Sequence, residues 1–140
     1  MPKGVKIVRK PQTFSFSDID KQQALMRDLL KKTSSDFAHH RYSNESARIY
    51  AWHAKDWMEY CKTHNVKLDM RNVEKSLEAP VLKYLFSKFV EAEKEKKNIS
   101  FYQQSCMAIK LWAKTLIKTD AQKIVSLVEK TQEKLLKLNI

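Results

Sequence analysis

The clearest periodic pattern in the chain lies between residues 43 and 64. Ser43 or Asn44 can cap a first helical turn there. Apolar side chains then recur every three or four positions and would form one stripe on a helix: Ala47, Tyr50, Ala54, Trp57, Met58 and Cys61. The pattern predicts an amphipathic helix from Asn44 to about His64.

Weaker helical patterns flank this segment. Ser17 or Asp18 can cap a helix over 18–32, and a short helical turn is expected over 35–42. After a connection over 65–72, anchored by Val66 or Leu68, the next helix is expected to begin near Glu78, because Pro80 suits a first turn. Its broad apolar face comprises Val81, Leu82, Leu85, Phe86, Phe89 and Val90.

Two further helices are expected in the last third of the chain. Asn98 and Ser100 mark a break and a cap, and they precede an apolar stripe: Phe101, Ser105, Ala108, Trp112 and Leu116. Asp120 can cap a last helix that carries lysines on one side. The other side of this helix is apolar and comprises Ile124, Leu127, Val128, Leu135 and Leu138.

The composition agrees with a helical protein. One glycine and three prolines leave few of the turns that hairpins need, and 140 residues with 43% hydrophobic content are enough for one core. We therefore expect an all-α fold, a compact bundle of four to five helices with an N-terminal extension. Residues 1–17 are expected to be a flexible basic arm, and residues 18–140 a single helical domain.

The charge indicates a polyanionic partner. The formal net charge is +11 and the pI is about 9.7, which favours a nucleic acid as the partner, although charge alone does not separate DNA from RNA. No apolar run approaches the roughly 20 residues that span a bilayer, and no signal sequence is visible. An intracellular protein is expected, nuclear in a eukaryote and cytoplasmic in a prokaryote or virus, with no membrane or small-molecule partner.

The sequence favours neither a metal site nor catalysis. Cys61 and Cys106 fall within expected helices, and we expect both to be reduced and packed. Cys61 and His64 have no partners at a zinc-binding spacing. A glycine-rich phosphate loop and a nucleophile elbow are both missing from the sequence. We expect no cofactor, no metal and no catalytic residue, so that this chain alone is not an enzyme.

One predicted helix face carries residues that suit DNA. Gln103, Lys110 and Lys114 stand at i, i+7 and i+11, roughly opposite the apolar stripe of the same helix. Glutamine can pair with an adenine edge, and lysine can reach a phosphate or a guanine. Ser100 and Tyr102, near the helix start, can contact phosphates. An ordinary solvated, lysine-rich face is the alternative at this stage.

Three sequence blocks, in this order, resemble the core-binding domain of tyrosine recombinases and phage-type integrases, including Crypton-type relatives. The blocks are Ser46-x3-Tyr50-x6-Trp57-x2-Tyr60-Cys61, Leu82-x2-Leu85 and Ser100-x4-Ser105-x2-Ala108-Ile109-Lys110. The resemblance covers about Asp36 to Leu138. It implies a small helical bundle that clasps duplex DNA and positions it for site-specific recombination or integration.

The resemblance also implies DNA-facing residues and a missing partner domain. The implied contacts are Ser43, Ser46, Arg48, Ser100, Gln103, Gln104, Lys110 and Lys114. Tyr50, Trp57 and Trp112 would hold the core. The family cuts DNA with a second domain that carries a His-x-x-Arg motif, which this chain lacks. The chain would be a recombinase fragment or a stand-alone DNA-binding module.

A helical protein-interaction module is the alternative function. The residues that could pack on a partner helix are Trp52, Met58, Phe86, Phe89 or the Leu127–Leu138 stripe. Self-association through the C-terminal helix is compatible with DNA binding, so a homo-oligomer on DNA stays open.

Overall fold

The computed structural model of the protein describes residues 13–32, 42–94 and 99–138. Within these ranges the expected all-α bundle is confirmed, and none of the helices is long and apolar enough to cross a membrane. The predicted helical turn over 35–42 falls almost wholly outside them. The five α-helices are α1 (Ile19–Lys31), α2 (Asn44–Thr63), α3 (Val73–Lys94), α4 (Ile99–Trp112) and α5 (Ala121–Leu136).

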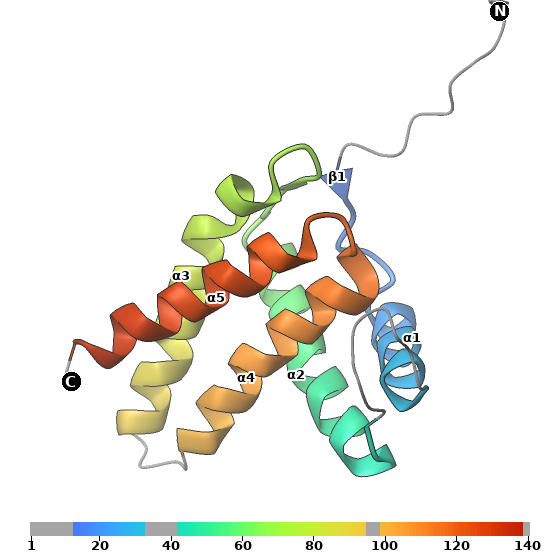
Figure 1. The fold of residues 1–140 in the computed structure, drawn as a ribbon, viewed down its shortest axis with the longest axis horizontal. Helices are drawn as coiled ribbons and strands as arrows, with labels where there is room; N and C mark the ends of the chain where they lie inside the picture. Colours follow the sequence, from blue (N-terminus) through green and yellow to red (C-terminus); the bar gives the residue numbers. More distant parts are fainter. Residues whose placement is uncertain (1–12, 33–41, 95–98, 139–140) are drawn as a thin grey trace, which may run out of the picture.

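Helices α2 and α4 lie together at the centre of the bundle (Figure 1). They carry the two largest buried side chains, Trp57 and Trp112, whose ring centroids lie 5.6 Å apart in an edge-to-face arrangement. Helix α1 covers α2 on one side, and α5 lies against α3 and α4 on the other. The core therefore forms where α2 and α4 meet.

Helix α2 confirms the strongest sequence prediction. The Ser43 hydroxyl oxygen accepts a hydrogen bond from the Ser46 amide at 3.1 Å, which caps the first turn. The predicted stripe is buried throughout, except that Tyr50 is half-buried at its edge.

Both cysteines are buried and free, as expected. Burial raises the pKa of the Cys106 thiol to about 11, so this group stays protonated.

Helix α3 begins earlier than the sequence pattern suggested. It starts at Val73 rather than near Glu78, because the Asn72 side chain caps it by accepting a hydrogen bond from the Lys75 amide at 3.2 Å. Pro80 consequently lies inside the helix, where a proline costs about 3 kcal/mol. The prediction that Pro80 occupies the first turn is wrong, since burial of the preceding turns outweighs this cost.

The aspartates before α1 and α5 do not act as expected. Asp18 and Asp120 occupy the N-cap positions, but neither side chain makes a capping hydrogen bond. Both residues have a left-handed backbone, with φ of 49° and 51°. Aspartate tolerates this conformation better than most residues. They therefore serve as turn residues in a chain that has only one glycine.

Helix α4 continues into a π-helix, η2 (Ala113–Ile117), where the Lys118 amide donates to the Ala113 carbonyl at 2.7 Å. A π turn holds more residues than an α turn, so Ile117 becomes buried while Leu116 stays half-exposed. Leu116, predicted to end the inward stripe, still packs against the edge of the core. Lys118 follows with φ 64° and ψ −45°, a strained conformation for a residue with a side chain.

The segment before α1 is part of the fold. Strand β1 (Thr13–Phe14) pairs antiparallel with β2 (Leu68–Asp69). The rings of Phe14 and Phe16 lie 5.9 and 6.1 Å from that of Trp112. The prediction of a flexible arm is thus wrong for residues 13–17, where alternating phenylalanines produce a strand-like pattern. The rest of the predicted arm, residues 1–12, lies outside the described residues.

The broad apolar face of α3 is only partly covered. Val81, Leu85 and Phe89 are buried in the core. Leu82 and Phe86, on the same helix, are 37% and 41% exposed. An apolar strip therefore remains on the outside of the bundle.

Candidate nucleic-acid interface

The exposed face of α4 is the surface that the sequence pattern indicated for DNA. Gln103 is exposed and Met107 is 37% exposed, whereas Cys106 and Ile109 between and beside them are buried. Lys110 continues this face on α4, Lys114 follows within η2, and both are partly covered. This face, comprising Gln103, Met107, Lys110 and Lys114, is called the α4 face below.

The two lysines of the α4 face differ in their surroundings. The Lys110 ammonium lies 3.4 Å from the Glu129 carboxylate of α5, and its side chain is only 17% exposed. Lys114 makes no ion pair with any described residue. Lys114 is consequently better placed to pair with an anion, while Lys110 would have to exchange its contact with Glu129.

Gln104 is directed towards α2 rather than outwards. Its carboxamide oxygen accepts a hydrogen bond from His53 Nε2 at 3.1 Å, and His53 Nδ1 lies 3.3 Å from the Ser105 hydroxyl oxygen. His53 is 3% exposed, and its ring lies 4.9 Å from those of Trp52 and Phe101. The sequence analysis did not single out His53. Its position next to Ala54, a residue of the predicted apolar stripe of α2, could have indicated that it is buried.

We expect the protein to lose stability through His53 as the pH falls below about 6.5. Burial lowers the pKa of this imidazole from 6.5, and it outweighs the raising effects of Gln104 and Asp56. Below pH 6.5 the unfolded chain then binds the proton more readily than the folded chain, so the free energy of unfolding decreases towards the lower, folded-state pKa. Urea titrations at several pH values measure this decrease.

The matching variant is His53→Gln, which keeps a polar side chain but cannot titrate. The difference in unfolding free energy between the protein and this variant should shrink as the pH is lowered through the same window. A difference that stays constant between about pH 7.5 and pH 5 would show that His53 is not held neutral by the fold.

The start of α2 holds three of the proposed contact residues. The Ser43 hydroxyl is engaged in capping, and the half-buried Ser46 supplies the amide that it binds. Arg48 is 61% exposed and pairs with Glu45 at 2.6 Å within the same turn. Helices α2 and α4 both begin at the lower end of the bundle in Figure 1, where Ser100 is half-buried. These residues thus lie apart from Lys114, at the other end of α4.

Tyr102 is a core residue, not a surface contact. It is 2% exposed and its ring packs against Phe89, with the centroids 5.3 Å apart. The expectation that Tyr102 can reach a phosphate is wrong, because its side chain lies between α3 and α4 and is buried from solvent.

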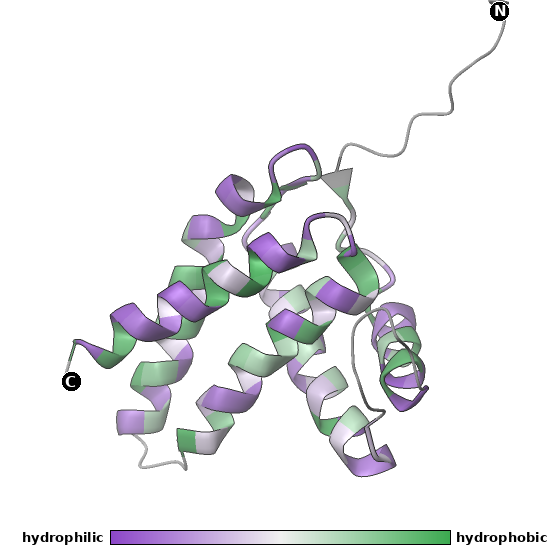
Figure 2. Cartoon of the chain, viewed as in Figure 1, coloured by the Kyte–Doolittle hydropathy of each residue, from purple (hydrophilic) through white to green (hydrophobic). Residues whose placement is uncertain are grey.

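Three lysines without an ion pair to a described residue belong to segments at the end of the bundle where the described chain begins: Lys67 precedes β2, Lys114 lies in η2 and Lys118 follows it. The β2 connection, the turn after η2 and strand β1 all lie at this end (Figure 1), and hydrophilic residues dominate its turns (Figure 2). Lys67, Lys114 and Lys118 make no ion pair with any described residue, whereas Arg71 and Lys123 pair locally with Asp69 and Asp120. We call Lys67, Lys114 and Lys118 the basic end.

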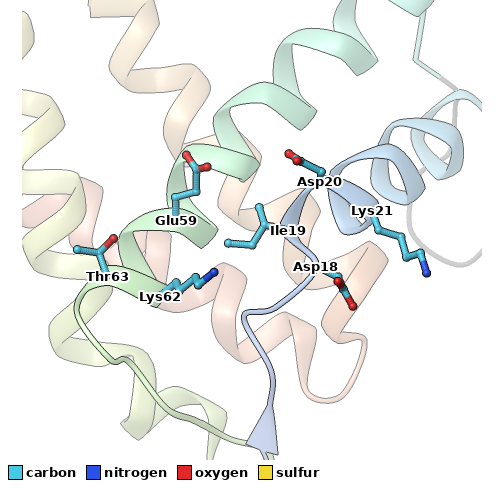
Figure 3. A pocket seen from close by; sticks show the side chains of 7 residues that line it. All are labelled: Asp18, Ile19, Asp20, Lys21, Glu59, Lys62 and Thr63. Carbon is cyan, nitrogen blue, oxygen red and sulfur yellow. The ribbon is translucent and has the colours of Figure 1, made fainter.

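The hollow between the start of α1 and the end of α2 has a different character. Its volume is about 910 Å³, and the carboxylates of Asp18, Asp20 and Glu59 surround it together with Lys21 and Lys62 (Figure 3). Asp20 also pairs with Lys55 at 2.9 Å. Three carboxylates would repel a phosphate, so this hollow does not suit a nucleic acid.

No family model, curated protein or solved structure matches the chain. Within the described ranges, no three His, Cys, Asp or Glu side chains gather in a way that could hold a metal ion. The geometry of the described residues is therefore the basis for a functional hypothesis.

Proposed function

We propose that the chain is a duplex DNA-binding module, which positions DNA for site-specific recombination or integration and performs no chemistry of its own. The observation that carries this proposal is the α4 face, which presents an exposed amide at Gln103 and leads to the unpaired Lys114 at the basic end. An amide can pair with a base edge while a lysine neutralises a phosphate.

The distribution of charge supports a polyanionic partner at this end. Elsewhere on the bundle some cations are paired with a carboxylate of the same helix, as in the pairs Arg48–Glu45 and Lys31–Asp28. Lys67, Lys114 and Lys118 of the basic end form no ion pair with a described residue, and residues 1–12, which precede Thr13, carry four cations and no carboxylate. The basic end and the cations before Thr13 would both attract the phosphates of a DNA backbone, and the two attractions would add.

The tyrosines support a binding role rather than a nucleophilic one. Burial raises the pKa of Tyr84, and its hydroxyl donates to Asp56 at 2.7 Å, which keeps the proton in place. Burial also raises the pKa values of Tyr42, Tyr60 and Tyr102. A nucleophile for phosphoryl transfer needs activation, whereas burial acts in the opposite direction.

Alanine substitution of Lys110 and Lys114 should weaken binding to every duplex sequence. Each lost phosphate contact should reduce the slope of log affinity against log salt by about one. Fluorescence anisotropy with labelled random duplex DNA, titrated at several salt concentrations, measures both quantities. Lys130→Ala with Lys134→Ala, on the distal half of α5, is the control with the same change in net charge.

Gln103→Ala should behave differently from the lysine variants. It should leave the salt slope unchanged and reduce the preference between selected and random duplexes by about 1–3 kcal/mol if this side chain reads a base. Equal affinities of the Lys110/Lys114 variant and the unchanged protein would refute the assignment of the α4 face. If the Lys110/Lys114 variant and the Lys130/Lys134 control lost equal DNA affinity, the loss would be explained by the change in net charge alone.

A further inference from the structure

An apolar groove lies on the side of the bundle formed by α3 and the end of α5. Its volume is about 560 Å³, and its floor consists of Leu82, Phe86, Leu135 and Leu138. Leu138, which the sequence pattern placed on the inner side of the last helix, follows the end of α5 and is 51% exposed. Together with the half-exposed Phe86, it gives the groove an accessible hydrophobic surface.

The rim of the groove is entirely cationic. Lys83 contributes from α3, and Lys134 and Lys137 contribute from the α5 side, while no carboxylate lines the groove. None of these three lysines forms an ion pair with a described residue. The nearest acidic residue along α5, Glu133, is exposed and lies outside the lining.

We propose that this groove binds an amphipathic helix of a protein partner, with apolar residues on one face and acidic residues beside them. Helix-in-groove recognition places side chains spaced i, i+4 and i+7 on an apolar floor. Acidic residues flanking these anchors would pair with the lysines of the rim. The floor is unsuited to phosphates, so this surface is separate from the α4 face.

The charge of the groove argues against two other occupants. A second copy docked through the same groove would bring two lysine rims together, which is unfavourable. The first twelve residues of the chain carry four cations and no carboxylate, so they would be repelled as well. A partner with the opposite charge is favoured by the same argument.

The test uses fluorescent synthetic peptides of about 15 residues with high helix propensity. One has leucine or phenylalanine at i, i+4 and i+7 and glutamate at the flanking positions. The second has lysine in place of glutamate, and the third has serine in place of the apolar residues. We expect the full chain to bind the acidic amphipathic peptide at least about tenfold more tightly than either of the others.

Two variants locate the binding to the groove. Phe86→Gln with Leu138→Gln removes exposed apolar surface, and Lys83→Gln with Lys134→Gln and Lys137→Gln removes the rim charge. Each should weaken binding of the acidic peptide about tenfold, with unchanged circular dichroism. The charge-matched control replaces Lys67, Lys114 and Lys118 with glutamine, and should bind the peptide normally.

Three results would overturn the proposal. The acidic peptide could bind no better than its serine counterpart, or it could bind the Phe86/Leu138 variant as tightly as the unchanged protein. Concentration-dependent self-association in sedimentation experiments, lost in the Phe86/Leu138 variant, would assign the groove to a second copy of the chain instead. Because none of these measurements involves DNA, their outcome is independent of the proposed DNA-binding function.

Discussion

Replacement of Trp112 by alanine should lower the free energy of unfolding by about 3–5 kcal/mol, the usual cost of deleting a large aromatic side chain from a closed core. Trp112 has no exposed surface, and its ring contacts those of Trp57, Phe14 and Phe16. One substitution therefore empties the junction of α2, α4 and the N-terminal segment. Since domains of this kind are stable by about 5–15 kcal/mol, the effect should be plain in urea denaturation followed by circular dichroism.

Two other tryptophan variants make the result specific. Within the described residues, the Trp112 indole N–H has no hydrogen-bond acceptor, so Trp112→Phe removes an unpaired donor, keeps an aromatic ring and should cost less. Trp52 is 50% exposed, and Trp52→Ala should change the stability by less than about 1 kcal/mol. If Trp112→Ala cost no more than Trp52→Ala, the ring cluster would not be the centre of this fold.

Glutamine substitution of Lys3, Lys6, Arg9 and Lys10 should weaken binding to duplex DNA about a hundredfold at physiological salt, if the DNA-binding function is correct. Four phosphate contacts contribute about 3.6 to the slope of log affinity against log salt, and the slope should fall by that amount. The stability should not change, because the packed part of the described chain begins after these residues, at β1. Salt titrations of DNA binding and urea denaturation test the two halves of this expectation.

The control for this variant removes the same number of charges elsewhere. Lys83, Lys130, Lys134 and Lys137 lie on α3 and the distal part of α5, and none pairs with a described carboxylate. Their replacement by glutamine should reduce DNA affinity much less. Equal losses of DNA affinity in the two quadruple variants would mean that the affinity depends only on the total charge of the protein. The assignment of the N-terminal residues as DNA contacts would then be abandoned.

Local signals decided which parts of the fold could be predicted. The bounds of α2 were predicted to within one residue, because a capping serine and an apolar stripe coincide there. The start of α3 was missed, because Pro80 suggests a first turn more strongly than Asn72 does, although Asn72 makes the cap. The π turn at η2 widens a helix whose α-helical period continues unbroken in the sequence, so the burial of Ile117 could not be foreseen.

In the candidate site, too, the features with a local sequence signal could be predicted and the contacts between distant residues could not. Periodicity alone was enough to expect Gln103 on the outside of α4. The contact of Gln104 with His53 joins residues 51 positions apart, and that of Lys110 with Glu129 joins residues 19 apart. Such contacts depend on which helices become neighbours, and a helical period carries no information about that.

The contact between Phe16 and Trp112 also sets an order of events during protein synthesis. A ribosome adds about 5–20 residues per second, so the roughly one hundred residues that separate the two rings take about 5–20 s to appear. Until then Phe14 and Phe16 have no aromatic surface from α4 to cover them. Their neighbours in the nascent chain are Lys10 and the other early cations, whose mutual repulsion keeps two such unfinished chains from pairing through their exposed strands.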